Sequence, residues 1–382
     1  MMMFEYQQTQ RFFAQIAGGL EPLGEEELAR LGARQIELTF HGLYFEASLE
    51  TLYRINYQSR FISRILAPLI SFPCDNPQLL YNQARSVAWA SLFSADQSFA
   101  IFANVSHSQI THSHYAALRV KDAIVDYFRM NFGRRPSIET IDPDVWIGLY
   151  IDHDMATISL DTSGGSLHRR GYRLASVEAP MQETVAAAII HFADWVQAGR
   201  PLYDPMCGSG TLLSEALMAY CQVPAAFLRS RFGFEHLPDF EKNSWLAIKA
   251  EADRQIRPSP EGWIAGSDLS AQAIAAAKSN LQRLPDGNKI QLAITDFRHI
   301  EKLNNTIIVC NPPYGIRLGE RKSLGSFYKS LGDFLKQRCR GSMAFIYFGN
   351  REWLKYIGLK PSWKKPLNNG GLDGRLAKFE LY

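Results

Sequence analysis

Residues 204–211 read DPMCGSGT, and this stretch predicts the fold of the second half of the chain. It follows the short apolar segment PLY at 201–203 and leads into the helix-like run LLSEALMAYC. Gly208 and Gly210 allow a tight turn and a close approach of the backbone to a ligand, and a helix that begins there offers free N–H donors. The loop has neither the GK[ST] of a P-loop nor the third small residue of a dinucleotide fingerprint. It therefore predicts a strand, a ligand-binding turn and a helix, without identifying the ligand.

Two aspartates end the next two predicted strands. Asp268 ends GWIAGSD, where a carboxylate can accept both ribose hydroxyls of an adenosine. Asp296 ends KIQLAITD, near the expected position of an adenine amino group. Ligands of such sheets bind outside the carboxyl ends of the strands. A single aspartate would be interpreted as a cap or turn residue, but three consecutive strand ends of this kind favour a binding site.

A fourth strand end carries NPPY at 311–314, directly after the apolar run at 307–309. An exocyclic amine on an aromatic base is a poor nucleophile because its lone pair is delocalised into the ring. The side-chain oxygen of Asn311 and the carbonyl of Pro312 can accept its hydrogens and favour the pyramidal form, while the prolines fix φ. Tyr314 would stack on a base that has left its own stack. The motif predicts chemistry at an exocyclic amine, with no metal and no covalent nucleophile.

The order of predicted helices and strands differs between the two halves of the sequence. From about residue 176, helices and strands alternate, which indicates a mainly parallel sheet covered on both faces. Residues 222–262 do not fit this alternation, and we interpret them as an insertion of unknown role. The first half predicts smaller α/β modules, with a strand pair turning at His41-Gly42 and a hairpin turning at His153-Asp154.

Further elements are expected in the first half. A strand is predicted at 99–107 and an amphipathic helix at 114–129 that ends near Gly133. Pro68, Pro73 and Pro77 predict interruptions in the stretch between the two modules.

Composition bounds the possible classes of protein. The chain has 382 residues, 46% hydrophobic and 21% charged, which is ordinary for globular proteins and long enough for more than one domain. No apolar run approaches the ~20 residues of a membrane span, so a cytosolic protein is expected. The net charge is only +3, so any surface for nucleic acid must be local. The local candidates are Arg134, Arg135, the run HRRGYR at 168–173, Arg317, Arg321 and Lys322.

Cysteine and histidine usage predicts no metal site. The five cysteines lie at wide spacings without a CxxC pair, so reduced thiols are expected. Cys207 and Cys310 are interpreted as small buried residues rather than nucleophiles. His107, His112 and His114 lie close together in sequence, but no convincing further ligand accompanies them.

Together these motifs resemble those of S-adenosylmethionine-dependent methyltransferases with the NPPY motif. Within them, the chain resembles the bacterial THUMP-domain RNA guanine-N2 methyltransferases that act on 23S ribosomal RNA. The resemblance covers almost the whole chain. It is carried by LRVKDAIVD (118–126), LDTSGGSLHRRGYR (160–173), DPMCGSGTLLSEA (204–216), GSD (266–268) and NPPYGIRLG (311–319).

The resemblance implies an α/β fold with three parts. A ferredoxin-like module is expected at 1–60, a THUMP RNA-binding domain at 61–165, and a doubly wound, Rossmann-like methyltransferase domain at 166–382. Some related enzymes carry a second methyltransferase domain, and this chain ends at Tyr382, so a single modification activity is expected.

The resemblance also implies a cofactor, a partner and roles for individual residues. The cofactor is S-adenosylmethionine, and the partner is RNA, with ribosomal RNA expected. The cofactor-binding residues would be Asp204, Cys207, Gly208, Gly210, Asp268 and Asp296, and the catalytic pocket would consist of Asn311, Pro312, Pro313 and Tyr314. The RNA-binding residues would be Lys121, Arg169, Arg170 and Arg173. The oligomeric state is not predicted.

Two alternative classes of function remain open. The NPPY pocket also suits adenine N6 in DNA or a glutamine amide in a protein, and only the N-terminal half favours RNA over these. The second alternative is a non-catalytic RNA-binding or ribosome-assembly factor with a vestigial methyltransferase domain. The intact Asp204, Gly208, Gly210, Asp268 and Asn311 disfavour that second alternative.

Overall fold

The computed structural model describes residues 3–176, 181–314 and 321–382. The chain forms two compact units, and neither is continuous in sequence. Unit 1 comprises residues 1–16, 24–167 and 229–250, and unit 2 comprises residues 17–23, 168–228 and 251–382. The sequence-based boundaries at 60 and 165 stay predictions. In the described part of the chain, no helix is both long and apolar enough to span a bilayer.

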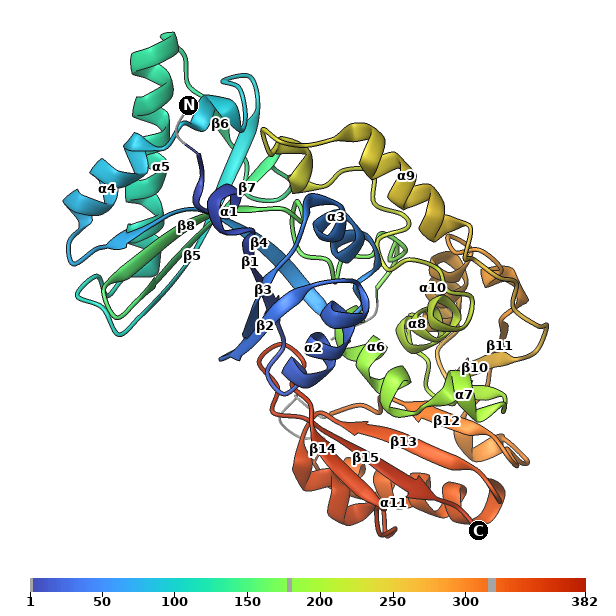
Figure 1. The fold of residues 1–382 in the computed structure, drawn as a ribbon. Coiled ribbons are helices and arrows are strands. Elements are labelled where there is room, and N and C mark those ends of the chain that lie inside the picture. Colours follow the sequence, from blue (N-terminus) through green and yellow to red (C-terminus); the bar gives the residue numbers. More distant parts are fainter. Residues whose placement is uncertain (1–2, 177–180, 315–320) are drawn as a thin grey trace. The chain divides into compact units, whose positions relative to one another are not determined.

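Unit 1 is built on one eight-stranded sheet with the order β2-β3-β1-β4-β8-β7-β5-β6 (Figure 1). Its strands are β1 (Arg11–Ile16), β2 (Arg34–Thr39), β3 (Gly42–Glu46), β4 (Ile62–Pro73), β5 (Ser98–Ser106), β6 (Ser137–Ile138), β7 (Val145–Asp152) and β8 (Met155–Asp161). Its helices include α1 (Glu5–Thr9), α2 (Glu21–Arg30), α3 (Leu49–Gln58), α4 (Pro77–Ser86) and α5 (Ser113–Phe132). The predicted hairpin is confirmed, with His153 and Asp154 at positive φ in its turn. The predicted helix is α5, which ends at Gly133 in the left-handed conformation.

The expected interruption at Pro68 is wrong, because β4 continues through this residue. Proline lacks an N–H donor and is tolerated in a sheet at a bulge or where no partner strand needs that donor. The β1 partner pairs with β4 only as far as Leu66. On the other side, the register with β8 shifts between Pro68 and Ile70. Pro77, by contrast, stands at the start of α4 behind the N-cap Asn76, as a helix-starting proline does.

The stretch at 222–262, interpreted from sequence as an insertion, contributes residues 229–250 to unit 1. Its backbone is joined to the loop after β8, since Phe234 N donates to Thr162 O at 2.8 Å. A Cβ on Gly233 would lie 1.8 Å from Asp161 O, so only glycine allows this approach. Arg229 donates to the carbonyls of Ser163 and Gly164 at 2.7 and 3.0 Å. This segment therefore stabilises the turn that follows the last strand of the sheet.

An aromatic cluster holds the rest of this segment against α3. Trp245, on α9 (Lys242–Asp253), packs edge-on to Tyr57 at 5.3 Å and to Phe234 at 5.1 Å between ring centroids. Tyr53 lies 4.7 Å from Phe234. Edge-to-face pairs of this kind add to the free energy of burial. The segment thus has a hydrophobic core in common with the N-terminal part of the chain.

Unit 2 contains a seven-stranded sheet with the order β11-β10-β9-β12-β13-β15-β14 (Figure 1). Its strands are β9 (Leu202–Asp204), β10 (Ile264–Asp268), β11 (Gln291–Ile294), β12 (Ile307–Cys310), β13 (Met343–Phe348), β14 (Trp363–Pro366) and β15 (Arg375–Glu380). Its helices include α6 (Glu183–Phe192), α7 (Trp195–Ala198), α8 (Thr211–Tyr220), α10 (Ala271–Leu281) and α11 (Arg321–Arg338). The first five strands in this order are parallel, and β13, β15 and β14 pair antiparallel. The doubly wound fold expected from the sequence is confirmed, and the closing antiparallel hairpin is an addition to it.

Both faces of this sheet are covered, as the wholly apolar sequence of β12 requires. On one face, α11 packs through Tyr328, Leu331 and Leu335 against a core that includes Ile308 and Cys310 of β12. Near the other end of the sheet, a Cβ on Gly266 of β10 would lie 2.8 Å from Leu213 of α8, so these two elements pack closely.

The aromatic cluster of unit 1 gives a prediction for stability. Trp245→Ala is expected to lower the free energy of unfolding of unit 1 by about 3–5 kcal/mol, because it leaves a cavity against the rings of Tyr53, Tyr57, Phe232 and Phe234. Leu246→Ala is the control, since Leu246 is 49% exposed on the same helix and should cost less than about 0.5 kcal/mol. Urea unfolding followed by circular dichroism measures both. Equal stability of the two variants would contradict the proposed role of the cluster.

Candidate functional site

The four sequence motifs lie at one edge of the unit 2 sheet. Asp204 ends β9, Asp268 ends β10, Asp296 follows β11 and Asn311 follows β12. These strands are adjacent and parallel, so their carboxyl ends meet at the same edge. The strand order reverses between β9 and β12, which is where ligands bind in doubly wound sheets. The predicted cofactor and pocket residues therefore lie along one edge of the sheet, and their assignment to a single site stays a prediction.

The carboxylate of Asp268 anchors the loop that follows β9. The Asp268 carboxylate accepts from Gly208 N at 3.0 Å and from Ser270 N at 2.9 Å. Gly208 and Gly210 have φ values of 54° and 80°, which favour glycine. Gly210 is the N-cap of α8 and provides no side-chain cap, so the first N–H groups of this helix are not capped by a side chain. A carboxylate, a glycine loop and a helix N-terminus are together suited to S-adenosylmethionine.

Asp204 differs from the other carboxylates because it is fully buried. It is 1% exposed, and burial raises its pKa to about 8, with the nearby Asp268 charge adding to the shift. Its side chain accepts from Met206 N at 3.0 Å, which shapes the turn into the glycine loop.

The carboxylate of Asp296 is paired with Arg298. The Arg298 side chain donates to its carboxylate, at 2.9 Å from Nε, and this contact holds the Asp296 pKa below its usual range. Asp296 also caps the short helix that follows by accepting from Arg298 N at 2.9 Å. It lies at the predicted strand end, with most of its acceptor capacity already used by Arg298.

Two buried aromatic donors anchor the NPPY loop. Tyr328 donates through its hydroxyl to Pro313 O at 3.0 Å, and Trp353 donates through Nε1 to Tyr314 O at 3.1 Å. The rings of Tyr328 and Trp353 are stacked, 5.7 Å apart and 4° from parallel. Tyr314 is 8% exposed and donates its hydroxyl to Asn311 Oδ1. Residues 315–320, which continue the quoted motif, lie outside the described residues.

The cysteines near this site are not activated nucleophiles. Burial raises the pKa of the Cys207 and Cys310 thiols well above the ordinary value, so both stay protonated at neutral pH. All five cysteines of the chain are free and buried. This supports their interpretation as small packing residues.

The expectation that Arg170 contacts RNA is corrected, because this residue lies inside unit 2. Its side chain is 1% exposed and pairs with the buried Glu215 at 3.4 Å. Arg173 is also engaged within the unit, donating to Glu183 at 2.9 Å and to Thr211 at 3.0 Å. Arg170 therefore binds α8, and Arg173 links α6 to α8. Arg169 is exposed, and its role in RNA binding stays a prediction.

Lys121 lies in a hollow of unit 1 with a volume of about 740 Å³. The guanidinium group of Arg119 lies over the Tyr81 ring in this hollow, 4.7 Å from the ring centroid. Asp122 pairs with Lys121 at 2.7 Å. The charged residues of the lining are Arg119, Lys121, Asp122, Asp126, Arg129 and Arg135, so cations outnumber anions. Lys121 stays a predicted RNA contact, now within a cationic hollow.

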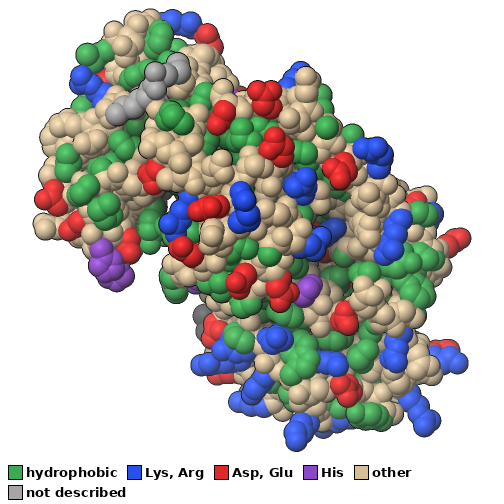
Figure 2. All heavy atoms as spheres, in the orientation of Figure 1, with side chains coloured by type: hydrophobic (Ala, Val, Ile, Leu, Met, Phe, Trp, Pro, Cys, Tyr) green, Lys and Arg blue, Asp and Glu red, His purple; other side chains and the backbone are tan. Residues whose placement is uncertain are grey.

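Sequence reasoning missed a strongly basic segment at residues 321–382. It contains 13 Lys and Arg against 4 Asp and Glu, a net charge of +9, although the whole chain carries only +3. Figure 2 shows Lys and Arg side chains gathered on the part of unit 2 that contains α11 and β14–β15. A local charge count would have found it. Its exposed members are Lys329, Lys336, Arg338, Arg340, Arg351, Lys355, Lys360, Lys364 and Lys365.

The other basic candidates from the sequence lie in different parts of the chain. Arg134 pairs with Asp96 on the surface of unit 1. Arg317 and the side chains of Arg321 and Lys322 lie outside the part of the chain that the structure describes.

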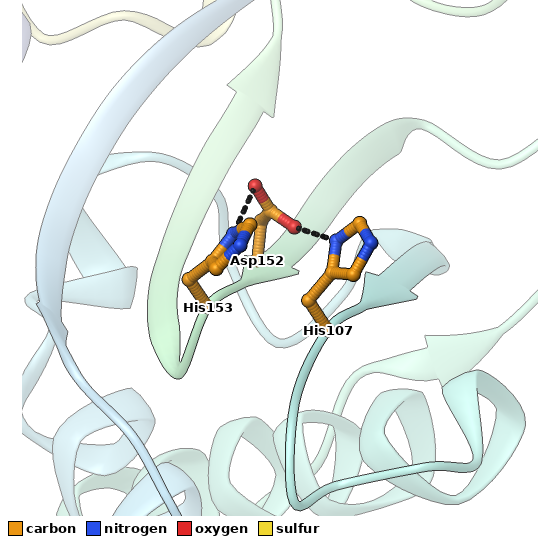
Figure 3. Close-up of side chains that lie close together, drawn as sticks. All are labelled: His107, Asp152 and His153. Carbon is orange, nitrogen blue, oxygen red and sulfur yellow. Dashed lines mark hydrogen bonds and ion pairs between the residues drawn. The ribbon is translucent and has the colours of Figure 1, made fainter.

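His107 belongs to a cluster, though with other partners than His112 and His114. Within the described residues, His107, Asp152 and His153 form a group with spacing suitable for a metal ion (Figure 3). The Nδ1 atoms of His107 and His153 lie 2.9 and 3.0 Å from the Asp152 carboxylate. These contacts, with the His107 bond first, hold the Asp152 pKa well below its usual range. Hydrogen bonding explains the cluster, and the absence of a resident metal stays a prediction.

Three family models match the chain. A model described as an RMKL-like methyltransferase domain matches residues 170–378. A THUMP domain model matches residues 74–161, and an RlmL ferredoxin-like domain model matches residues 11–66.

Curated relatives match along nearly the whole chain. A putative RNA methyltransferase of Synechocystis is 41% identical over 98% of this chain and 97% of the relative. A ribosomal RNA large subunit methyltransferase K/L of Syntrophotalea carbinolica is 39% identical over 97% of this chain and 53% of the relative. The chain thus spans about half the length of the K/L relatives that it matches.

Solved structures share the fold. A putative methyltransferase crystallised with S-adenosylhomocysteine has a TM-score of 0.83 at 26% identity and covers 97% of this chain and 98% of its own. A predicted N6-adenine-specific DNA methylase of Listeria monocytogenes has a TM-score of 0.81 at 26% identity and covers 99% of this chain and 98% of its own. With the glycine loop and its Asp268 brace at the switch point of the sheet, these matches show that the chain belongs to the RMKL-like family of S-adenosylmethionine-dependent methyltransferases.

Proposed function

We propose that this protein methylates the exocyclic N2 of a guanine in RNA, with 23S ribosomal RNA as the substrate and the cytoplasm as its location. The observation that carries the proposal is the place of the NPPY loop, at the end of β12 and beside the cofactor loop of β9. The names of the relatives support an RNA substrate, and the resemblance of the motifs supports guanine N2.

The chain's own residues provide the acceptors for a target amine. S-adenosylmethionine supplies an electrophilic methyl group when it is bound. Asn311 Oδ1 and Pro312 O accept the two amine hydrogens, which turns the lone pair of the nitrogen out of conjugation with the base. Pro312 and Pro313 fix φ, and the bonds from Tyr328 and Trp353 hold the next carbonyls in place. This loop therefore needs little reorganisation during the reaction.

Two basic regions support RNA as the substrate class. In unit 1 the hollow around Lys121 combines cations with the Tyr81 ring, which suits phosphates and a stacked base. In unit 2 the segment 321–382 places exposed lysines and arginines on the methyltransferase fold itself. Lys365 also lies 4.8 Å from the centre of the Phe192 ring. Cations interleaved with aromatic rings are common in surfaces that bind single-stranded RNA.

A second candidate is the N6 of adenine in DNA. The fold shared with a predicted N6-adenine-specific DNA methylase of Listeria monocytogenes favours it, and the same two acceptors would suit either amine. A glutamine amide in a protein would suit the two acceptors as well, but a protein substrate would leave the cationic hollow of unit 1 unexplained. The non-catalytic alternative is disfavoured because Asn311, Gly208 and Asp268 are intact in the sequence and Asp268 accepts a hydrogen bond from Gly208 N.

Tritiated methyl transfer to three pools tests the proposed function. The pools are ribosomal RNA from cells that lack this enzyme, genomic DNA and total protein, each followed by analysis of the labelled product. N2-methylguanosine in the RNA is the expected product. N6-methyladenine in DNA, or label confined to protein, would overturn the substrate while retaining the amine chemistry.

Asn311→Ala and Asp268→Ala are expected to fail in different ways. Loss of the Asn311 acceptor should lower kcat by about 10²–10³-fold while cofactor affinity stays the same. Loss of the Asp268 brace should weaken cofactor binding about 10- to 100-fold, because two hydrogen bonds to a charged group disappear, and should leave RNA affinity unchanged. Turnover assays and calorimetry measure the two effects.

Asn304→Ala is the control for these variants, since Asn304 is exposed and precedes β12 at the opposite end of the strand. It should behave as the wild type in both assays. Unchanged turnover in Asn311→Ala would refute its role as acceptor. Equal losses of cofactor and RNA affinity in Asp268→Ala would indicate a folding defect instead.

The basic segment gives a prediction for binding. The double change Lys364→Glu and Lys365→Glu is expected to weaken RNA binding and to lower the salt dependence of log Kd by about 2, because two phosphate contacts are lost. Lys278→Glu on α10 is the control with an exposed lysine outside this segment. Filter binding between 50 and 200 mM salt, roughly the range in which such contacts act, measures the slope. An unchanged slope in the double variant would remove this surface from the RNA interface.

A further inference from the structure

The glycine loop after β9 contains two residues in the left-handed conformation, Gly208 and Gly210. Glycine loses more conformational freedom on folding than any other residue, so a loop of this kind needs contacts from outside it to keep one shape. Asp268 provides one such contact, at Gly208 N. Ser209, between the two glycines, is 3% exposed and accepts two further hydrogen bonds. These two bonds hold the centre of the loop.

The first of them comes from Asn280 on α10, which is 1% exposed. Its Nδ2 donates to Ser209 O at 3.0 Å and to Ala175 O at 2.9 Å. Its Oδ1 accepts from Leu174 N at 2.8 Å and from Ala175 N at 3.1 Å. A backbone N–H only donates, so these contacts identify the oxygen of the amide. One buried amide thus uses both hydrogens and both lone pairs to join α10, the glycine loop and residues 174–175.

The packing of α10 brings a second residue to the same loop. Ala277 lies three positions before Asn280, and a Cβ on Gly210 would lie 3.1 Å from the Ala277 Cβ. Positions three apart are neighbours on a helix surface. One face of α10 therefore lies against both Ser209 and Gly210, and Asn280 is the polar residue of that contact.

The second bond to Ser209 comes from Arg173, the last residue of the run HRRGYR at 168–173. Its Nη1 donates to Ser209 Oγ at 3.3 Å, and its Nη2 donates to Thr211 Oγ1 at 3.0 Å. Its Nε donates to Glu183 at 2.9 Å. This run, which we expected to bind RNA, thus ends in a contact with the glycine loop.

We propose that Asn280 is a positioning residue for S-adenosylmethionine, which acts through Ser209 to hold the glycine loop in the conformation that receives the cofactor. Arg173 supports the loop through the side chain of the same serine. The inference rests on the part of the proposed function that is common to every methyl acceptor, the binding of S-adenosylmethionine at this loop.

The effect of Asn280 should appear in cofactor affinity rather than in the chemical step. When a loop has the binding conformation for only a fraction of the time, the apparent Kd rises by the inverse of that fraction. A bound cofactor orders the loop again, so kcat at saturating cofactor should stay the same. A purely structural residue would instead lower the stability of unit 2 and leave the cofactor affinity of the folded protein unchanged.

Asn280→Asp tests this role. Aspartate has nearly the same shape and still accepts from Leu174 N and Ala175 N, but its carboxylate cannot donate to Ser209 O. We expect the Kd of S-adenosylhomocysteine, measured by calorimetry, and the KM of S-adenosylmethionine to rise about tenfold, with kcat unchanged. Gln282→Glu is the control, because it makes the same change of amide to carboxylate at an exposed position at the end of α10. It should bind and turn over as the wild type does.

Two further variants complete the experiment. Asn280→Ala removes the same donors without burying a charge, so it provides the test if the carboxylate prevents folding, and its Kd should rise to a similar degree. Ser209→Ala removes only the bond from Arg173 and should raise Kd by about three- to fivefold. Combined with Asn280→Ala, it should cost less than the sum of the two, because both changes release the same loop. Wild-type Kd in the Asn280 variants, or losses that add in full, would overturn the proposal.

A second readout needs neither RNA nor turnover. Amide hydrogen exchange at residues 207–211 should be faster in the Asn280 variants and should return to the wild-type rate when S-adenosylhomocysteine is bound. Exchange in β13, which is buried in the core, should not change. Faster exchange in β13 as well would indicate a general folding defect and overturn the positioning role.

The two proposals can fail separately. If the wild type labels no guanine but the Asn280 variants lose cofactor affinity as expected, the proposed substrate fails and the positioning role stands. If guanine is labelled and the Asn280 variants bind the cofactor as the wild type does, the positioning role fails and the proposed function stands.

Discussion

The hydrogen bond from Gly208 N–H to the Asp268 carboxylate is the interaction on which the candidate site depends. It joins the loop after β9 to the end of β10, and the same carboxylate also accepts from Ser270 N. Because the strands are parallel and adjacent, this one side chain fixes the spacing of two strand ends. The glycine loop can then keep its left-handed turns and present a helix N-terminus to the cofactor. The brace thus links two of the four motifs at this edge of the sheet.

The reacting end of the site is rigid for a different reason. Tyr328 and Trp353 are buried aromatic residues, yet each ends in a donor that needs an acceptor. The carbonyls of Pro313 and Tyr314 meet that need, so the core of the sheet and the pocket loop satisfy each other. A loop with two prolines has few backbone donors of its own to provide such anchors. The stiffness that the sequence suggests thus comes from prolines and from the core together.

Contacts between residues that are far apart in the chain explain the remaining segments. Residues 229–250 lie within the methyltransferase half of the sequence but belong to unit 1, where Phe234 N and Arg229 bind the turn after β8. The sequence led us to expect Arg170 and Arg173 at an RNA surface, but within unit 2 they pair with Glu215 and Glu183. The net charge of +9 over residues 321–382 takes their place as the cationic feature of that unit.

The sequence by itself determined the doubly wound fold and the four motifs that lie at the ends of β9, β10, β11 and β12, along one edge of the sheet. Those features depend on local periodicity, on turn chemistry and on the rule that parallel strands end at one edge. Only the tertiary structure decided that β4 passes through Pro68. The sheet tolerates a proline at this position because β1 stops pairing with β4 at Leu66 and the register with β8 shifts after Pro68. It alone brought Asn369 of the β14–β15 turn to the backbone N–H of Gln182, which lies 187 positions earlier in the chain. Burial of a charge or pairing of distant segments depends on partners that are far apart in the chain, and only the folded protein brings them together.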